Sequence, residues 1–147
     1  MFEKISGLFG VLKPLEALSS LLIRVPFAAI FLYHGIFKFV SGIEIFAANL
    51  SGAGAFSMPL AVLVAIAEIL AGTGVLIGAF KKDALGDTAT RLAGIAAAPV
   101  LIGAIVMYHW GRWSFVPQPP LHPIGGMEFQ VLLLCLAAYF MIKGNDA

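Results

Sequence analysis

The chain has 147 residues, the length of one domain, and 61% of them are hydrophobic whereas only 12% are charged, against about a quarter in an ordinary soluble domain. The mean hydropathy is +0.99, and about a third of the unfolded surface of so short a chain stays exposed after folding. This composition therefore excludes a soluble enzyme and requires a lipid solvent. The formal charge of +1 without a run of Lys or Arg excludes a nucleic-acid partner, and the single cysteine, Cys135, excludes a disulfide scaffold.

The N-terminal residues are expected to form a short helix in the membrane interface. Apolar side chains recur there three or four residues apart, at Phe2, Ile5, Phe9, Leu12 and Leu15. A cleaved signal peptide is the alternative, but Glu3 and Glu16 stand where such a peptide carries cations, and no convincing cleavage site follows. Residues 1–17 are therefore interpreted as an interfacial segment.

Four apolar stretches follow, each at or near the roughly 20 residues that cross a bilayer as a helix. In chain order they run from Leu21 to Phe39, from Leu60 to Phe80, from Leu92 to Trp110 and from about Gly126 to Ile142. The stretches are continuously apolar and do not alternate with a period of two, which disfavours a β-barrel. The sequence thus predicts an all-α integral membrane four-helix bundle over residues 18–143, with a tail at 144–147.

Basic residues in the connections predict the orientation, because cytoplasmic loops collect Lys and Arg. One side of the membrane receives Lys4, Lys13, Arg24, Lys81, Lys82, Arg91 and Lys143. The other side receives only Lys38 and Arg112. Both termini are therefore expected to be cytoplasmic, with Trp110 and Trp113 as anchors in the outer interface.

Ionisable side chains inside a bilayer are costly and are functional candidates by default. Glu68 lies eight residues below the outer end of the second span, near the midplane. His34 and Lys38 are four residues apart, so both project from one face of the first helix. The other polar residues stand at the same side, at the end of the third span and the start of the fourth: His109, Glu128 and Gln130. One layer in the outer half is therefore expected to receive a polar group from every helix.

Each of these residues also has a structural interpretation. Glu68 has small helical neighbours, which mark helix contacts in membranes, so we expect it to point into the bundle and pair with His34 or Lys38. As an alternative, it simply bonds two helices together. Lys38 and Arg24 are open to snorkelling toward the headgroups, and His109 to a place in the interface.

The chemistry that suits this layer is binding of a small carrier with an oxygen head group. His34 and Glu68 have the properties of a proton-exchanging pair, and a quinone's ring carbonyls would take protons from them. Haem between His34 and His109, or zinc, is a weaker interpretation because the two histidines lie at different depths and no metal-ligand spacing is present. We expect no intrinsic haem or metal. A small proton or ion transporter also stays open.

Polar and small residues of the spans follow a recognisable order: Arg24, Tyr33-His34-Gly35, Lys38, Ala67-Glu68, Gly72, Leu76, Gly78, Arg91 and Glu128. In this order the chain resembles the DoxX family of small four-helix bacterial and archaeal membrane proteins, over about residues 20–143. The resemblance implies a multi-pass protein of the cytoplasmic (inner) membrane. It also implies a link to redox chemistry, as in the DoxD-type subunits of thiosulfate:quinone oxidoreductase, although a shared fold need not mean a shared function.

The sequence therefore leads to one hypothesis and one rival. The hypothesis is a membrane subunit of a quinone-linked oxidoreductase with a quinone site in the outer half of the bundle, in which His34 and Glu68 are catalytic and Lys38, His109 and Glu128 bind the head group. The rival is an accessory subunit without chemistry of its own that stabilises a larger membrane complex. In either case the expected partners are lipid and other membrane or redox subunits, and a GxxxG pair in the second span leaves a homo-oligomer open.

Overall fold

The computed structural model describes residues 9–114 and 125–147, and within these ranges its regular structure is entirely helical. Four helices build the bundle: α2 (Glu16–Val40), α4 (Ser57–Phe80), α5 (Ala84–Ala104) and α6 (Glu128–Lys143). Short helices flank or connect them: η1 (Phe9–Leu15), α3 (Ile43–Asn49), η2 (Ser51–Phe56), η3 (Ile105–His109) and η4 (Gly144–Asp146).

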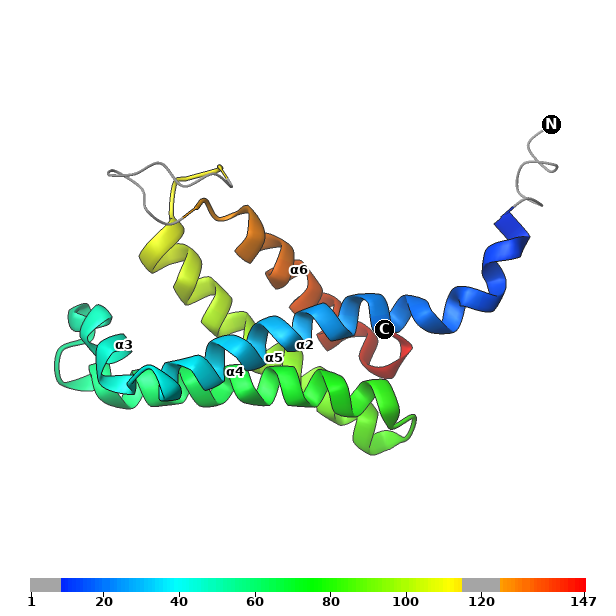
Figure 1. Cartoon of the computed structure of the whole chain (residues 1–147), viewed down its shortest axis with the longest axis horizontal. Coiled ribbons are helices and arrows are strands. Elements are labelled where there is room, and N and C mark those ends of the chain that lie inside the picture. The colour runs from blue at the N-terminus through cyan, green and yellow to red at the C-terminus, as the bar shows by residue number, and fades with distance from the viewer. Residues whose placement is uncertain (1–8, 115–124) are drawn as a thin grey trace.

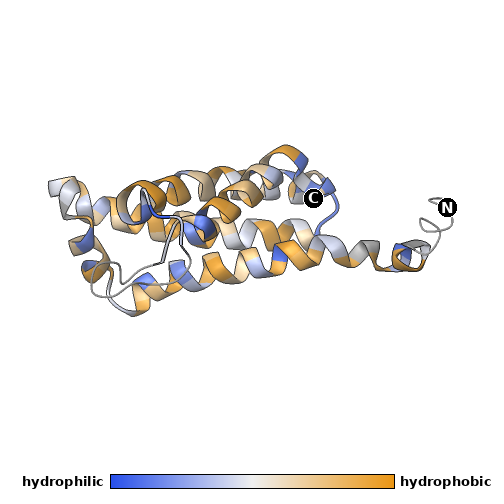
Figure 2. Cartoon of the chain, turned by 90° about the horizontal axis from the view of Figure 1, so that it is seen from above, coloured by the Kyte–Doolittle hydropathy of each residue, from blue (hydrophilic) through white to orange (hydrophobic). Residues whose placement is uncertain are grey.

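Three of the described helical segments are long and apolar enough to cross a membrane: Leu18–Val40, Gly52–Phe80 and Ala84–His109. Apolar residues dominate their ribbons in Figure 2. Helix α6 has 16 residues and rises about 24 Å at 1.5 Å per residue, which is less than the hydrocarbon core of roughly 30 Å. The all-helical, multi-pass architecture is therefore confirmed, whereas a fourth membrane span remains a prediction.

The four main helices run alternately in opposite directions, so the start of α2 and the end of α6 lie at the same end of the bundle (Figure 1). We name this end the inner end, and the opposite end, which carries α3, the outer end. Helices α5 and α6 diverge from α2 and α4 toward the outer end (Figure 1). This up-and-down order agrees with two termini on one side of a membrane, and their cytoplasmic location stays a prediction.

Small residues let the helices approach closely. A side chain on Gly72 would place its Cβ 2.7 Å from Leu32 of α2, and one on Gly74 would lie 2.7 Å from the carbonyl oxygen of Ala89 in α5. Gly78, the other half of the GxxxG pair, packs directly against Thr90 of α5. The pair is therefore used within the chain, between α4 and α5, and a homo-oligomer stays a prediction.

The third long helix begins eight residues before Leu92, where the sequence predicted the third span to start, so its polar first turns are helical. Helix α5 begins at Ala84, because the Asp83 side chain caps it by accepting a hydrogen bond from the Gly86 N–H at 3.0 Å. The helix then continues past Ala104 as one wider π-helical turn, η3, to His109. Its first turns carry polar residues that hydropathy alone assigned to a loop.

The connection between α2 and α4 is also helical. Helix α3 covers the outer end of α4, with Ala47 and Leu50 buried against Ala61. At the other end of the chain, the described part of the expected interfacial helix is η1, which leads directly into α2. Residues 1–8 of that segment, and residues 115–124 of the Pro-rich outer connection, lie outside the described residues.

Candidate functional site

An ion pair joins α2 to α4 in the outer half of the bundle. The Lys38 Nζ lies 2.8 Å from Oε1 and 2.6 Å from Oε2 of Glu68, so the ammonium contacts both carboxylate oxygens. The two side chains are 13% and 8% exposed. Lys38, and not His34, is thus the partner of Glu68. Snorkelling of Lys38 toward the headgroups is wrong, because its ammonium is committed to a neighbouring helix.

Local sequence explains why these two side chains meet. Gly35 lies between His34 and Lys38 on α2, and a Cβ on it would lie 2.8 Å from the Ala65 carbonyl oxygen of α4. The absence of a side chain lets the two helices approach at the turn below the ion pair. The Lys38 Nζ also contacts α3, because it lies 4.7 Å from the centroid of the Phe46 ring, a cation–π contact.

A cavity of about 320 Å³, the outer cavity, borders this ion pair. Its walls come from α2, α3, α4, α5 and η3: His34, Lys38, Phe46, Leu50, Leu60, Val64, Glu68, Pro99, Val100, Gly103, Ala104, Met107 and Tyr108. Most of this lining is apolar, and its charged residues are the Lys38–Glu68 pair. A mostly apolar hollow of this size with a few convergent polar groups is typical of small-molecule sites.

The shape of α5 contributes to the hollow. Pro99 and Gly103 stand four residues apart on the wall, and a Cβ added to Gly103 would meet nothing within 4 Å. Beyond them the wider turn η3 brings Met107 and Tyr108 to the cavity. Single π-helical turns of this kind are frequent at functional sites. Sequence reasoning missed these residues, for which the only signal was a proline within an apolar span.

A second cavity, of about 110 Å³, lies between α2, α4, α5 and α6, and we name it the inter-helix cavity. It is lined by Ile30, Phe31, His34, Glu68, Val100, Leu101, Ala104, Phe129, Gln130 and Leu133. His34 and Glu68 line both cavities. The two residues that were predicted to act together therefore stand where the two hollows adjoin.

The other two predicted site residues lie apart from the ion pair. His109 is buried, and its Nδ1 lies 2.6 Å from the Gly125 carbonyl oxygen while its Nε2 lies 3.0 Å from Nε2 of Gln130. The His109 ring is thus packed within the protein, and its place in the membrane interface stays a prediction. Neither His109 nor Glu128 lines either cavity. His109 reaches the inter-helix cavity only through Gln130.

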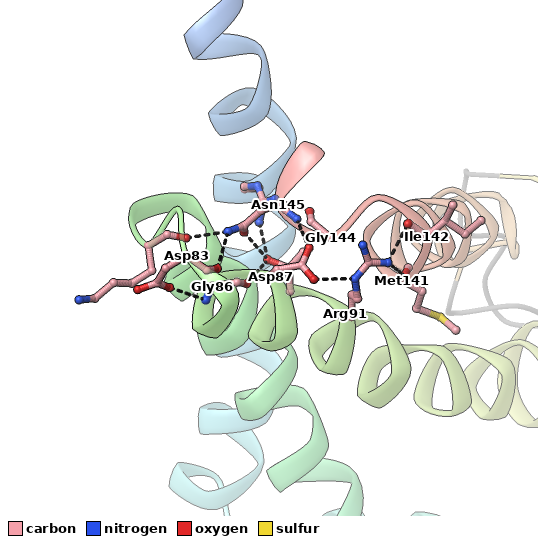
Figure 3. A network of polar contacts seen from close by, with 11 residues as sticks. Asp83, Gly86, Asp87, Arg91, Met141, Ile142, Gly144 and Asn145 are labelled. Carbon is pink, nitrogen blue, oxygen red and sulfur yellow. Dashed lines mark hydrogen bonds and ion pairs between the residues drawn. The ribbon is translucent and has the colours of Figure 1, made fainter.

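A separate polar region occupies the inner end, and we name it the inner network. Arg24 is fully buried, and it donates to the Ser20 and Thr90 hydroxyls and to the carbonyl oxygens of Val75, Gly144 and Ala147. Snorkelling of Arg24 is therefore wrong. Beside it, the chain that follows α6 is bound to α5: Asp87 accepts from Arg91 Nε at 2.9 Å and from the Asn145 N–H at 3.0 Å (Figure 3).

Metal binding has no counterpart in the described part of the chain, where no group of three or more His, Cys, Asp or Glu side chains is placed to hold an ion.

Comparison with known families matches residues 19–110 to the DoxX family. The match runs from α2 to the residue after η3 and includes Arg24, His34, Lys38, Glu68 and His109. It confirms the resemblance drawn from the sequence over that range, and it ends before α6 and Glu128. No curated protein and no solved structure matches the chain.

Proposed function

We propose, from the premise that the chain belongs to the DoxX family, that it is a membrane subunit of a redox complex and binds a quinone head group in the outer cavity. In this proposal the chain lies in the cytoplasmic membrane of a bacterium or archaeon, with the outer end away from the cytoplasm. The electrons come from a cofactor of a partner subunit.

The observation that carries the proposal is a charged pair on the wall of an apolar cavity. Charged side chains are expensive in a bilayer and usually mark a substrate or proton path. Lys38 and Glu68 satisfy one another, yet both also line a hollow of about 320 Å³ that is otherwise apolar. A quinone head group is complementary to such a cavity, since its ring is apolar and its carbonyls accept hydrogen bonds.

The residues of the cavity fit such a head group in kind. The His34 ring is a donor for one ring carbonyl, and the Lys38 ammonium would reach another by giving up its long bond of 3.4 Å to the His34 carbonyl oxygen. Tyr108 and Phe46 add aromatic side chains to the lining. Met107 lines the cavity and is 51% exposed on the molecular surface, so this side gives an isoprenoid tail a route to lipid. His109 and Glu128 lie outside the lining, so we propose no direct contact for them.

A bound quinone would take up two electrons and two protons. The Glu68 carboxylate would relay one of these protons, taking it up and passing it on, and the His34 ring would supply the other. The Lys38 ammonium keeps the carboxylate in place through both oxygens and offsets its charge. The apolar walls from α4 and α5 surround the Glu68 carboxylate, whose side chain is 8% exposed.

The test is titration of decylubiquinone into the purified chain in lipid nanodiscs, followed by quenching of Trp110 and Trp113 fluorescence. We expect saturable binding that is weakened about tenfold by Glu68→Gln or His34→Ala, since about 1.4 kcal/mol corresponds to a factor of ten. The matched control is Asp87→Asn, which changes a carboxylate of the inner network. Equal affinities in all variants would overturn the site.

A second variant tests the outer cavity without altering a charged residue. Gly103→Leu places its side chain into the outer cavity, because nothing lies within 4 Å of the added Cβ. We expect it to abolish binding with little change in melting temperature. Thr88→Leu, at an exposed position of the same helix, is its control.

The accessory-subunit function has its own supporting observation, because the Lys38–Glu68 pair also holds α2 to α4. In that case Glu68→Gln would lower the melting temperature, and no variant would show saturable quinone binding.

A further inference from the structure

The inter-helix cavity is too small for a drug-sized ligand and large enough for water. Its volume of about 110 Å³ lies below the roughly 300 Å³ at which small-molecule pockets begin. One water needs only about 10–15 Å³ of such volume, together with two or more polar partners. Three polar side chains line the cavity, and each comes from a different helix: His34 of α2, Glu68 of α4 and Gln130 of α6. Its lining from α5 is apolar.

The hydrogen bonds of His109 determine how Gln130 is oriented. The Gly125 carbonyl oxygen accepts only, so in the neutral form of His109, which we assign, the ring proton lies on Nδ1 and is donated across 2.6 Å. His109 Nε2 is then an acceptor and takes its hydrogen bond from the Gln130 amide nitrogen at 3.0 Å. A reversed amide would set two acceptors against each other. The Gln130 Oε1 is therefore fixed as the atom that points away from His109.

This oxygen is buried and has no hydrogen-bond partner among the described residues. A buried acceptor without a donor costs about 1–3 kcal/mol, so such atoms usually bond to ordered water or to a ligand. Gln130 also lines the inter-helix cavity, whose other polar lining groups are His34 and Glu68. A donor in that cavity would satisfy the oxygen.

We propose that the inter-helix cavity holds an ordered water, which donates to the Gln130 Oε1 and hydrogen-bonds to Glu68 or His34. Gln130 is the positioning residue of this site, and His109 fixes Gln130. The water connects Glu68 and His34 to α6 by a route separate from the outer cavity, so it stays available when a ligand fills that cavity. The water site stands on the cavity geometry, and only its use as a proton route rests on the proposed function.

Hydroxyl-radical footprinting of the full chain in nanodiscs tests the site, because radicals formed from bound water oxidise the side chains beside it. Phe31 and Phe27 are a matched pair, one turn apart on α2 and 3% and 1% exposed, and only Phe31 lines the cavity. We expect Phe31 to be oxidised several-fold faster than Phe27 and than buried Phe140. Equal, slow oxidation of all three would overturn the proposal.

Variants of Gln130 show whether it holds the water. Gln130→Leu should bring the oxidation of Phe31 down to that of Phe27, and Gln130→Glu, which keeps an acceptor oxygen, should restore it. Thr73→Val, an exposed polar position of α4 away from this cavity, should have no effect. Unchanged oxidation of Phe31 in Gln130→Leu would contradict the role of Gln130. No quinone is present in this experiment, so its outcome is independent of quinone binding.

Discussion

The two polar regions of this membrane protein differ in how far their hydrogen bonds are satisfied. In the inner network the Arg24 guanidinium is fully buried and is surrounded by two hydroxyls and three carbonyl oxygens. In the outer half, Lys38 and Glu68 bond to each other, but both border a cavity. The first arrangement leaves no room for a ligand and serves the fold. The second keeps polar groups at the wall of a hollow, where a ligand can reach them.

The inner network also shows how backbone oxygens and an aromatic ring stabilise a buried cation. Arg24 donates to the Gly144 carbonyl oxygen at 2.9 Å, at the C-terminal end of α6, where the helix dipole favours a positive charge. Its guanidinium carbon lies 5.3 Å from the centroid of the Phe140 ring. Asp87, Arg91 and Asn145 then tie the same end of α6 to α5 (Figure 3).

Replacing Arg24 should produce the largest loss of stability. Arg24→Met leaves the Val75 and Gly144 carbonyls and the Thr90 hydroxyl without their donor, and we expect a loss of about 3 kcal/mol in the free energy of unfolding, at about 1–3 kcal/mol per unsatisfied group. Melting in detergent, followed by Trp fluorescence, measures it. Arg91→Gln, at a partly exposed arginine of the same end, is the control. Similar losses for both variants would contradict a central role for Arg24.

The outer pair should show strong coupling between its members. Lys38→Met leaves the Glu68 carboxylate buried without its cation, so the single variant should be less stable than Lys38→Met with Glu68→Gln. We expect a coupling energy of about 1–3 kcal/mol from a double-mutant cycle of unfolding. Additive effects of the two substitutions would show that the pair does not hold α2 to α4.

Substitutions at two glycines compare the close packing at the inner end with the open space at the outer end. Gly78→Ala forces its Cβ against the Thr90 hydroxyl and to within 2.9 Å of Arg24 Nη1, so it should lower the melting temperature by several degrees. Gly103→Ala meets nothing within 4 Å and should be neutral, or stabilising by up to about 1 kcal/mol through helix propensity. Equal effects on melting would contradict this difference between the two ends.

The smallest effect is expected at the rim of the inner network. Asp87 and Arg91 are four residues apart and their side chains are 38% and 41% exposed, which weakens an ion pair through solvent and salt. Asp87→Asn should therefore shift the melting temperature only slightly, and less at high salt. A shift comparable to that of Arg24→Met would place the centre of the inner network at Asp87 instead.

The sequence alone was sufficient for the helical class, and it narrowed the partner of Glu68 to His34 or Lys38. Glu68 stood out by its depth, and the i, i+4 spacing placed His34 and Lys38 on one face. Arg24 was interpreted wrongly because its partners are backbone carbonyls of α4 and of the chain after α6, and these carry no signal in the sequence. The cavities were equally invisible, since their walls bring together side chains of several helices and of the wider turn η3.

The most direct test of the ligand role assigned to the outer cavity is the position at which a photoreactive azidoquinone attaches to the chain in nanodiscs. We expect the adduct on residues 103–108 of α5 and η3 or on Leu60 and Val64 of α4, with protection by excess decylubiquinone. An adduct confined to the apolar groove between α4 and α5, at Leu70, Ile77 or Leu92, would contradict the assignment, as would labelling that excess quinone leaves unchanged.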